Sequence, residues 1–178
     1  MTSSTRWYHK SEMVMAASAV IVSVAAVVVA VYSAWIDRSF ARAATWPHLE
    51  IYRSYADDRL SHGVSNRGTG PAIVHYAVLE DDGTAYPTWF AWLDARHTVP
   101  EEGFIQSHIS TRVLSPEQQV EVFSTNNAAL ARAVFANDGM NLRLCYCSVF
   151  DECWLTDGAN RPERVASCDT QPATPFEQ

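Results

Sequence analysis

The sequence of 178 residues is poor in lysine and rich in acidic groups. It has one lysine, Lys10, and its 13 basic residues are outnumbered by 20 Asp and Glu residues, for a formal net charge of −7. Nucleic acids bind basic surfaces, so this balance argues against nucleic acid as a partner. The length also excludes a multidomain enzyme, because one domain of ordinary size accounts for most of the chain.

Charged side chains are entirely missing from residues 13–36. Of these 24 residues 21 are apolar, and as a helix they would span about 36 Å, which is enough to cross the hydrocarbon core of a bilayer. In lipid only a helix or a closed barrel satisfies its own backbone, so the segment is predicted to be a transmembrane helix. The alternative, a cleaved signal peptide, would have a shorter apolar region followed directly by a small-x-small site. We therefore expect a retained anchor that binds the lipid bilayer through residues 13–36.

The orientation of this helix is less constrained by the sequence. Arg6 and Lys10 precede the apolar run and Arg38 and Arg42 follow it, so the positive-inside count is balanced. A short head, residues 1–12, is typical of a signal anchor, and all four cysteines follow the helix. Both features favour a cytoplasmic N-terminus and an extracytoplasmic, oxidising location for the rest of the chain.

Small residues recur at four-residue intervals within the apolar run, which allows two such helices to approach closely. They are Ala19 and Ser23, and then Ala26, Ala30 and Ala34. In a run so rich in alanine and valine this spacing also arises by chance. Helix-mediated association and a plain anchor therefore both stay open.

Residues 37–46 are predicted to continue as a helical stalk that ends before Pro47, because the residue before a proline disfavours the α region. Residues 47–157 combine short runs of period two with turn signals. This pattern predicts a mainly β fold, an Ig-like antiparallel β-sandwich with one or two short helices. The expected strands are 48–55, 60–66, 72–79, 107–114, 118–124, 140–150 and a last one from 153, and the expected helices are 87–96 and 128–136. Residues 158–178 contain prolines and few apolar residues, which predicts a loose C-terminal tail.

The four cysteines form the most specific local pattern. Alternation places Cys145 and Cys147 on the same face of a strand, and a turn brings Cys153 back beside them. One of the first two would pair with Cys153 and the other with Cys168, although the sequence does not choose the connectivity. Free buried thiols and a redox or zinc site are the alternatives. Because C-x-C followed by wide intervals fits zinc knuckles poorly, no metal ligand is assigned.

Candidates for catalysis are few. No motif combines a nucleophile, a base and an orienting acid, so no catalytic residue and no cofactor is assigned. Asp94 and His97 would be neighbours on a helix, but no nucleophile motif accompanies them. The glycines of residues 66–71 lead into a strand rather than a helix, which favours a turn over a phosphate-binding loop.

An aromatic cluster lies between two turn signals. It consists of Tyr86, Trp89, Phe90 and Trp92. Core packing is one interpretation, and an exposed contact surface for a partner or for lipid headgroups is the other.

Several features occur together in this chain: an uncharged anchor, the junction W-P-H-L at 46–49, the turn N-x-G-x-G-P-A at 66–72, the pair Asp82-Gly83 and the motif C-Y-C-S-V-F-D-E-C-W at 145–154. In this combination the chain resembles a group of uncharacterised bacterial single-pass membrane proteins over roughly residues 14–156. The resemblance implies a bacterial inner-membrane protein with a small β-rich domain outside the lipid. It carries over no reaction and no catalytic residue.

Three functional hypotheses follow from these observations. The first is a membrane-anchored, periplasmic binding or accessory module that acts through a protein partner or a homo-oligomer and performs no catalysis. The second is an envelope redox protein or hydrolase that uses the region of Cys145, Cys147 and Cys153, or Asp94 and His97. The third is a cytoplasmic-facing domain that is stabilised by zinc.

Overall fold

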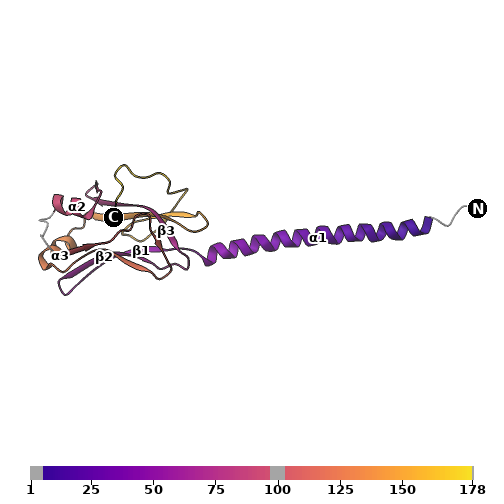
Figure 1. Cartoon of the computed structure of the whole chain (residues 1–178), viewed down its shortest axis with the longest axis horizontal. Helices are drawn as coiled ribbons and strands as arrows, with labels where there is room; N and C mark the ends of the chain where they lie inside the picture. Colours follow the sequence, from indigo (N-terminus) through magenta and orange to yellow (C-terminus); the bar gives the residue numbers. More distant parts are fainter. Residues whose placement is uncertain (1–5, 97–102, 178) are drawn as a thin grey trace, which may run out of the picture. The chain divides into compact units, whose positions relative to one another are not determined.

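The computed structural model describes residues 6–96 and 103–177, and the chain divides into two compact units, residues 1–43 and 44–178. The first unit holds a single helix, α1 (Arg6–Ala44), which is drawn without interruption in Figure 1. Its stretch Ser11–Ala44 is long and apolar enough to cross a membrane, as membrane anchors and signal sequences both are. The helix ends before Pro47, as expected.

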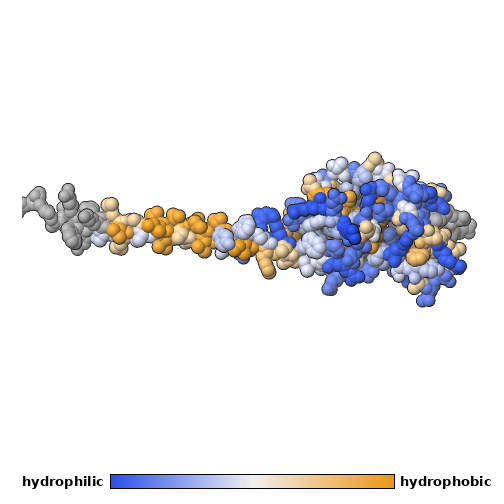
Figure 2. All heavy atoms as spheres, turned by 180° about the vertical axis from the view of Figure 1, so that it is seen from behind, coloured by the Kyte–Doolittle hydropathy of each residue, from blue (hydrophilic) through white to orange (hydrophobic). Residues whose placement is uncertain are grey.

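The surface of α1 is apolar on all sides between Met13 and Ile36. Figure 2 shows apolar side chains along this helix, whereas the visible face of the second unit is mainly hydrophilic. The large apolar side chains of α1 are exposed over most of the length of this helix, from Met13 to Phe40. A helix that is apolar all round requires lipid or protein around it.

The second unit is mainly β and consists of two antiparallel sheets arranged as a sandwich (Figure 1). One sheet has the strand order β1-β2-β7-β5, and the other has the order β10-β9-β8-β3-β4, with β6 paired to β3. The strands are β1 (Leu49–Ala56), β2 (Arg59–Asn66), β3 (Ala72–Asp81), β4 (Thr84–Tyr86), β5 (Phe104–Gln106), β6 (Val113–Leu114), β7 (Gln119–Thr125), β8 (Met140–Cys147), β9 (Cys153–Thr156) and β10 (Glu163–Val165).

A tight turn explains the first hairpin. β1 and β2 pair up to Ala56 opposite Arg59, which leaves Asp57 and Asp58 as a two-residue loop with φ angles of 50° and 61°. Positive φ at both positions is the type I′ arrangement, whose twist matches that of paired strands. Aspartate tolerates positive φ better than most residues, so the adjacent aspartates suit this turn, which lies between the strands expected at 48–55 and 60–66.

The core between the sheets is centred on aromatic rings. The short helix α2 (Trp89–Arg96) turns Trp89 and Trp92 inward, and both are fully buried. The ring of Trp89 lies 5.0 Å from that of Phe123 and 5.6 Å from that of Phe176, measured between centroids. Burial of such large side chains contributes about 1.5–3 kcal/mol each to the stability of the sandwich.

The second short helix, α3 (Ala128–Phe135), confirms the helix predicted at 128–136, and Asn127 caps its N-terminus. The side-chain oxygen of Asn127 accepts hydrogen bonds from the N–H groups of Ala129 and Leu130, both at 3.1 Å. These bonds satisfy donors of the first turn that have no partner inside the helix.

The predicted strand 107–114 is wrong over most of its length. Only its last two residues form a strand, β6, and the sequence pattern missed β5. The segment before β6 instead buries Ile109 and Ser110, and the Ser110 hydroxyl donates a hydrogen bond to the carbonyl oxygen of Phe176. A short apolar alternation does not distinguish a strand from an extended segment that enters the core.

The C-terminal segment is docked on the sandwich, which corrects the expectation of a loose tail over residues 158–178. β10 pairs with β9, Cys168 forms a disulfide, and Phe176 is buried. The N–H of Phe176 also donates a hydrogen bond to the carbonyl oxygen of Ala77, at 3.0 Å. A few well-placed anchors hold this segment, and such long-range contacts produce no local period in the sequence.

Candidate functional site

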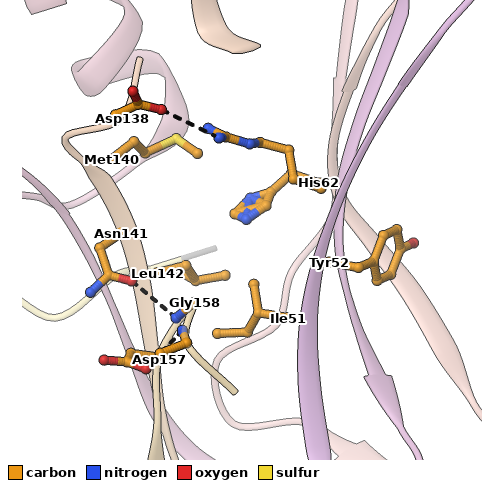
Figure 3. A pocket seen from close by; sticks show the side chains of 11 residues that line it. Ile51, Tyr52, His62, Asp138, Met140, Asn141, Leu142, Asp157 and Gly158 are labelled. Atoms are coloured by element: carbon orange, nitrogen blue, oxygen red, sulfur yellow. Dashed lines mark hydrogen bonds and ion pairs between the residues drawn. The ribbon is translucent and has the colours of Figure 1, made fainter. Parts of the chain in front are cut away.

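A cleft of about 470 Å³ opens at one side of the sandwich, between β1 of one sheet and β8 of the other. Its volume is within the usual range of ligand sites. Figure 3 shows His62 near the middle, Asp138 and Asp157 at opposite ends, and the ring of Tyr52 turned toward the other face of its sheet. The residues around the cleft are Ile51, Tyr52, Arg53, His62, Asp138, Met140, Asn141, Leu142, Asp157, Gly158 and Ala159.

His62 of β2 is a buried polar group at the centre of the cleft, with 4% of its surface exposed. Its Nδ1 has no hydrogen-bond partner among the residues that the structure describes. Its ring packs edge-on against that of Trp89, with 5.7 Å between the centroids. Burial, assisted by the positive charge of Arg53, lowers the pKa of His62 to about 4. The imidazole is therefore neutral at pH 7 and offers one donor and one acceptor nitrogen.

Arg53 lies directly opposite His62 in the β1–β2 register, and it also lines the cleft. Its guanidinium donates to the carbonyl oxygen of Asn137 at 3.0 Å and lies 5.2 Å from the centroid of the Phe135 ring. It is also 3.9 Å from the carboxylate of Asp138, whose side chain is 97% exposed. Such an exposed ion pair contributes little, so the carbonyl oxygen and the ring hold the cation in place.

The β9–β10 loop closes the other end of the cleft. The side-chain amide of Asn160 accepts from the N–H of Ile51 at 2.7 Å and donates to the carbonyl oxygen of Ile51 at 2.8 Å. Asn160 has a φ of 53°, a conformation that asparagine tolerates better than most residues. The N–H of Gly158 donates to the side-chain oxygen of Asn141 on β8 at 3.1 Å. The loop therefore connects the two sheets across the cleft.

The four cysteines form two disulfides within a buried cluster. Cys145 pairs with Cys168 and Cys147 pairs with Cys153, with Cα–Cα distances of 5.7 and 4.0 Å. This is one of the two pairings that the sequence left open, and no cysteine of the described chain is free. The sulfurs of Cys147, Cys153 and Cys168 lie within 4.8 Å of one another, a spacing that also suits a metal ion. Zinc requires thiolates, however, and here these sulfurs are bonded as disulfides.

Of the two interpretations of the aromatic cluster, core packing holds for Trp89 and Trp92, so these two residues are wrong as candidates for a contact surface. Trp89 and Trp92 are buried because their three-residue spacing places both on the inward side of α2. Phe90 is 54% exposed, and Tyr86 is partly buried with its hydroxyl accepting from Arg96 at 3.2 Å. Most of the cluster thus belongs to the core.

The other predicted candidates are not assembled into a site. Asp94 is exposed on α2, and His97 lies outside the residues that the structure describes. The small residues proposed for helix association are all exposed on α1, and their contact with a second helix stays a prediction. They are Ala19, Ser23, Ala26, Ala30 and Ala34.

Asp81 is a buried carboxylate that the sequence motifs did not single out, because acidic residues before a glycine are typical of solvated turns. Asp81 ends β3, and its Oδ2 accepts from the indole N–H of Trp92 at 2.7 Å and from the side-chain amide of Asn137 at 2.9 Å. The Nε of Arg96 is 3.3 Å from the same oxygen. Asp81 shares the period-two phase of the buried Leu79, and this signal could have identified it.

No protein-family model, no curated protein and no solved structure matches this chain.

Proposed function

We propose that this protein is a membrane-anchored binding module whose Ig-like sandwich works on the periplasmic side of a bacterial inner membrane. In this proposal α1 crosses the lipid bilayer, and the sandwich acts by contact with a protein partner or a second copy of the chain rather than by catalysis. The observation that carries the binding role is the cleft. There a cation, Arg53, and a neutral imidazole, His62, face a cavity of ligand size.

The disulfides support an oxidising location for the sandwich. Disulfides persist in the periplasm and outside cells, and they are rare in the reducing cytosol. Both bonds, Cys145–Cys168 and Cys147–Cys153, lie C-terminal to α1. A cytoplasmic N-terminus and an extracytoplasmic sandwich agree with this placement.

The charge of the sandwich favours a protein partner over a lipid surface. Removing Arg6 and Lys10 from the 13 basic residues, and Glu12 from the 20 acidic ones, leaves 11 minus 19, or −8, beyond the head. Anionic headgroups attract basic segments and repel acidic ones.

A redox role is the second candidate, and the crowding of the sulfurs of Cys147, Cys153 and Cys168 favours it. If the Cys147–Cys153 bond exchanges with thiols of another protein, Cys147→Ser abolishes the cellular phenotype while the protein stays abundant. If the bond is structural, the same substitution lowers abundance.

A reporter fusion tests the location. Alkaline phosphatase needs its disulfides for activity, so a fusion after Gln178 should be active, and β-galactosidase at the same position should be inactive. The reverse pattern would place the sandwich in the cytoplasm. It would then support the third hypothesis, a zinc-stabilised cytoplasmic domain.

Cross-linking tests the binding role. A photoreactive residue in place of the exposed Asp138, at the rim of the cleft, should capture a protein in native membranes. The same residue in place of Asp169, an exposed position outside the cleft lining, serves as the control. A monomer in detergent together with no specific capture at Asp138 would refute the proposal.

A further inference from the structure

The backbone of β1 has an unpaired edge that borders the cleft. In antiparallel strands the backbone groups of alternate residues point to opposite sides. Ile51 directs its N–H and C=O away from β2, toward the side chain of Asn160. Arg53 and Tyr55 follow in the same phase, and no hydrogen bond joins their backbone groups to another part of the described chain. Two N–H and two C=O groups are thus presented along this edge.

Asn160 occupies the place that the first residue of an added strand would take. Its carboxamide carries the same donor and acceptor as a peptide unit, and it uses both on Ile51. This contact caps the edge at one residue and leaves the positions beyond it, toward the β1–β2 turn, uncovered.

The opposite wall of the cleft is the beginning of β8, which also lacks a neighbouring strand on one side. β9 pairs with β8 only from Leu144 to Cys147, so the beginning of β8 pairs with β3 alone. Asn141 and Leu142 of this part line the cleft, and Ile51 faces them from β1. An extended chain placed here would lie between two strand edges, with apolar contacts from Ile51 and Leu142.

The charged side chains that line the cleft are Arg53, Asp138 and Asp157, and together they carry one net negative charge. Arg53 and Asp138 lie 3.9 Å apart and balance each other at one end. At the other end Asp157 accepts a hydrogen bond from the N–H of Ala159 and has no cationic partner among the described residues. One carboxylate is therefore left to pair with a basic group of a ligand.

We infer that the cleft binds an extended, basic peptide segment of a partner protein, which adds to the sandwich as a strand along β1. The inference rests on the proposed function and specifies the partner. The backbone of the segment pairs with Arg53 and Tyr55, and a basic side chain pairs with Asp157. A polar group of the segment bonds the imidazole of His62, which is buried, lacks a partner at Nδ1 and points into the cleft (Figure 3).

Peptide display on the full-length protein tests this inference. A library of random peptides of roughly ten residues, long enough to span β1, is selected on the protein in nanodiscs and in parallel on empty nanodiscs. We expect the protein to enrich peptides with Lys or Arg among β-forming residues. The Kd of the enriched peptides is then measured by fluorescence anisotropy.

Two changes distinguish strand addition from other modes of binding. N-methylation of the peptide removes N–H donors. N-methylation of the alternate residues whose N–H groups face β1 should weaken binding about fivefold. N-methylation of the residues between them should leave the Kd almost unchanged. Asp157→Asn keeps an oxygen for the N–H of Ala159 but loses the charge, and it should weaken binding about threefold. Asp169→Asn, at an exposed acidic position outside the cleft lining, should leave the Kd unchanged and is the matched control.

Three results would each overturn the inference: no enrichment over empty nanodiscs, equal binding by Asp157→Asn, or tolerance of N-methylation at every position. Competition by free arginine as effective as that by the peptide would also overturn it, because the cleft would then be a small-molecule site. These measurements do not depend on membrane topology. Their failure is therefore distinguishable from failure of the proposed function, which the reporter fusion and cross-linking decide.

Discussion

Acidification should destabilise the sandwich through His62. The pKa of this imidazole is about 4 in the folded protein and near 6.5 in the unfolded chain. Between these values the unfolded chain binds a proton that the folded protein does not bind. Stability is therefore complete above pH 6.5 and falls as the pH decreases from 6.5 toward 4. The linked loss of unfolding free energy is about 2 kcal/mol at pH 5 and about 3 kcal/mol at pH 4.

The magnitude depends on the surroundings of the imidazole. Only 4% of His62 is exposed, and burial penalises its charged form more than any other factor. Arg53, directly opposite in the register, adds repulsion. The carboxylate of Asp138 lies near Arg53 at the exposed rim, where water screens its charge.

Urea unfolding of the full-length protein in detergent, followed by tryptophan fluorescence, measures this effect, because Trp89 lies 5.7 Å from His62. The control is His62→Leu, which removes the titrating group and puts an apolar side chain in its place. The difference in unfolding free energy between the two proteins should change by about 2 kcal/mol from pH 7 to pH 5. Carboxylates titrate in both proteins and cancel. Parallel pH profiles would refute the reasoning.

Three further predictions concern what holds the sandwich together. Replacing Cys145 and Cys168 together by Ala removes a disulfide with a sequence separation of 23 and should lower the free energy of unfolding by about 3 kcal/mol. Replacing Cys147 and Cys153, with a separation of 6, should lower it by about 2 kcal/mol, and urea midpoints would show the difference. The opposite order would contradict the loop-entropy account. Phe176→Ala should cost about 3–5 kcal/mol and increase hydrogen exchange in the C-terminal segment, whereas an unchanged midpoint would mean that this segment is not anchored. Gly70→Ala places a Cβ 1.9 Å from a backbone carbonyl oxygen and should lower the Tm clearly, while Gly158→Ala, with its nearest atom at 3.4 Å, should have little effect.

Local signals predicted the parts of the fold that depend on neighbouring residues. The Asp57-Asp58 turn follows from two residues that tolerate positive φ, and the cap of α3 follows from Asn127 before a run of helix formers. The inward face of β2 follows from the alternation of Leu60, His62 and Val64, all buried. In each case the determining contacts lie within a few residues.

The same signals failed where a side chain is satisfied from a distant segment. Asp81 looks like a solvated turn residue until the indole of Trp92 and the amide of Asn137 are placed around it. Phe176 looks like part of a loose tail until the core offers it a site beside Trp89. Composition describes a residue, and its burial depends on partners that composition does not contain.

The sequence by itself determined the apolar helix, most of the strands and the closeness of three of the four cysteines, because these depend on local composition and period. Only the tertiary structure decided the partner of Cys168, the burial of Trp89 and the existence of the cleft. The cleft is closed by Asn160 bonding Ile51 across a separation of 109 residues, and no local pattern specifies such a contact. The chemistry of the site arises where two sheets meet, and their packing alone brings these residues together.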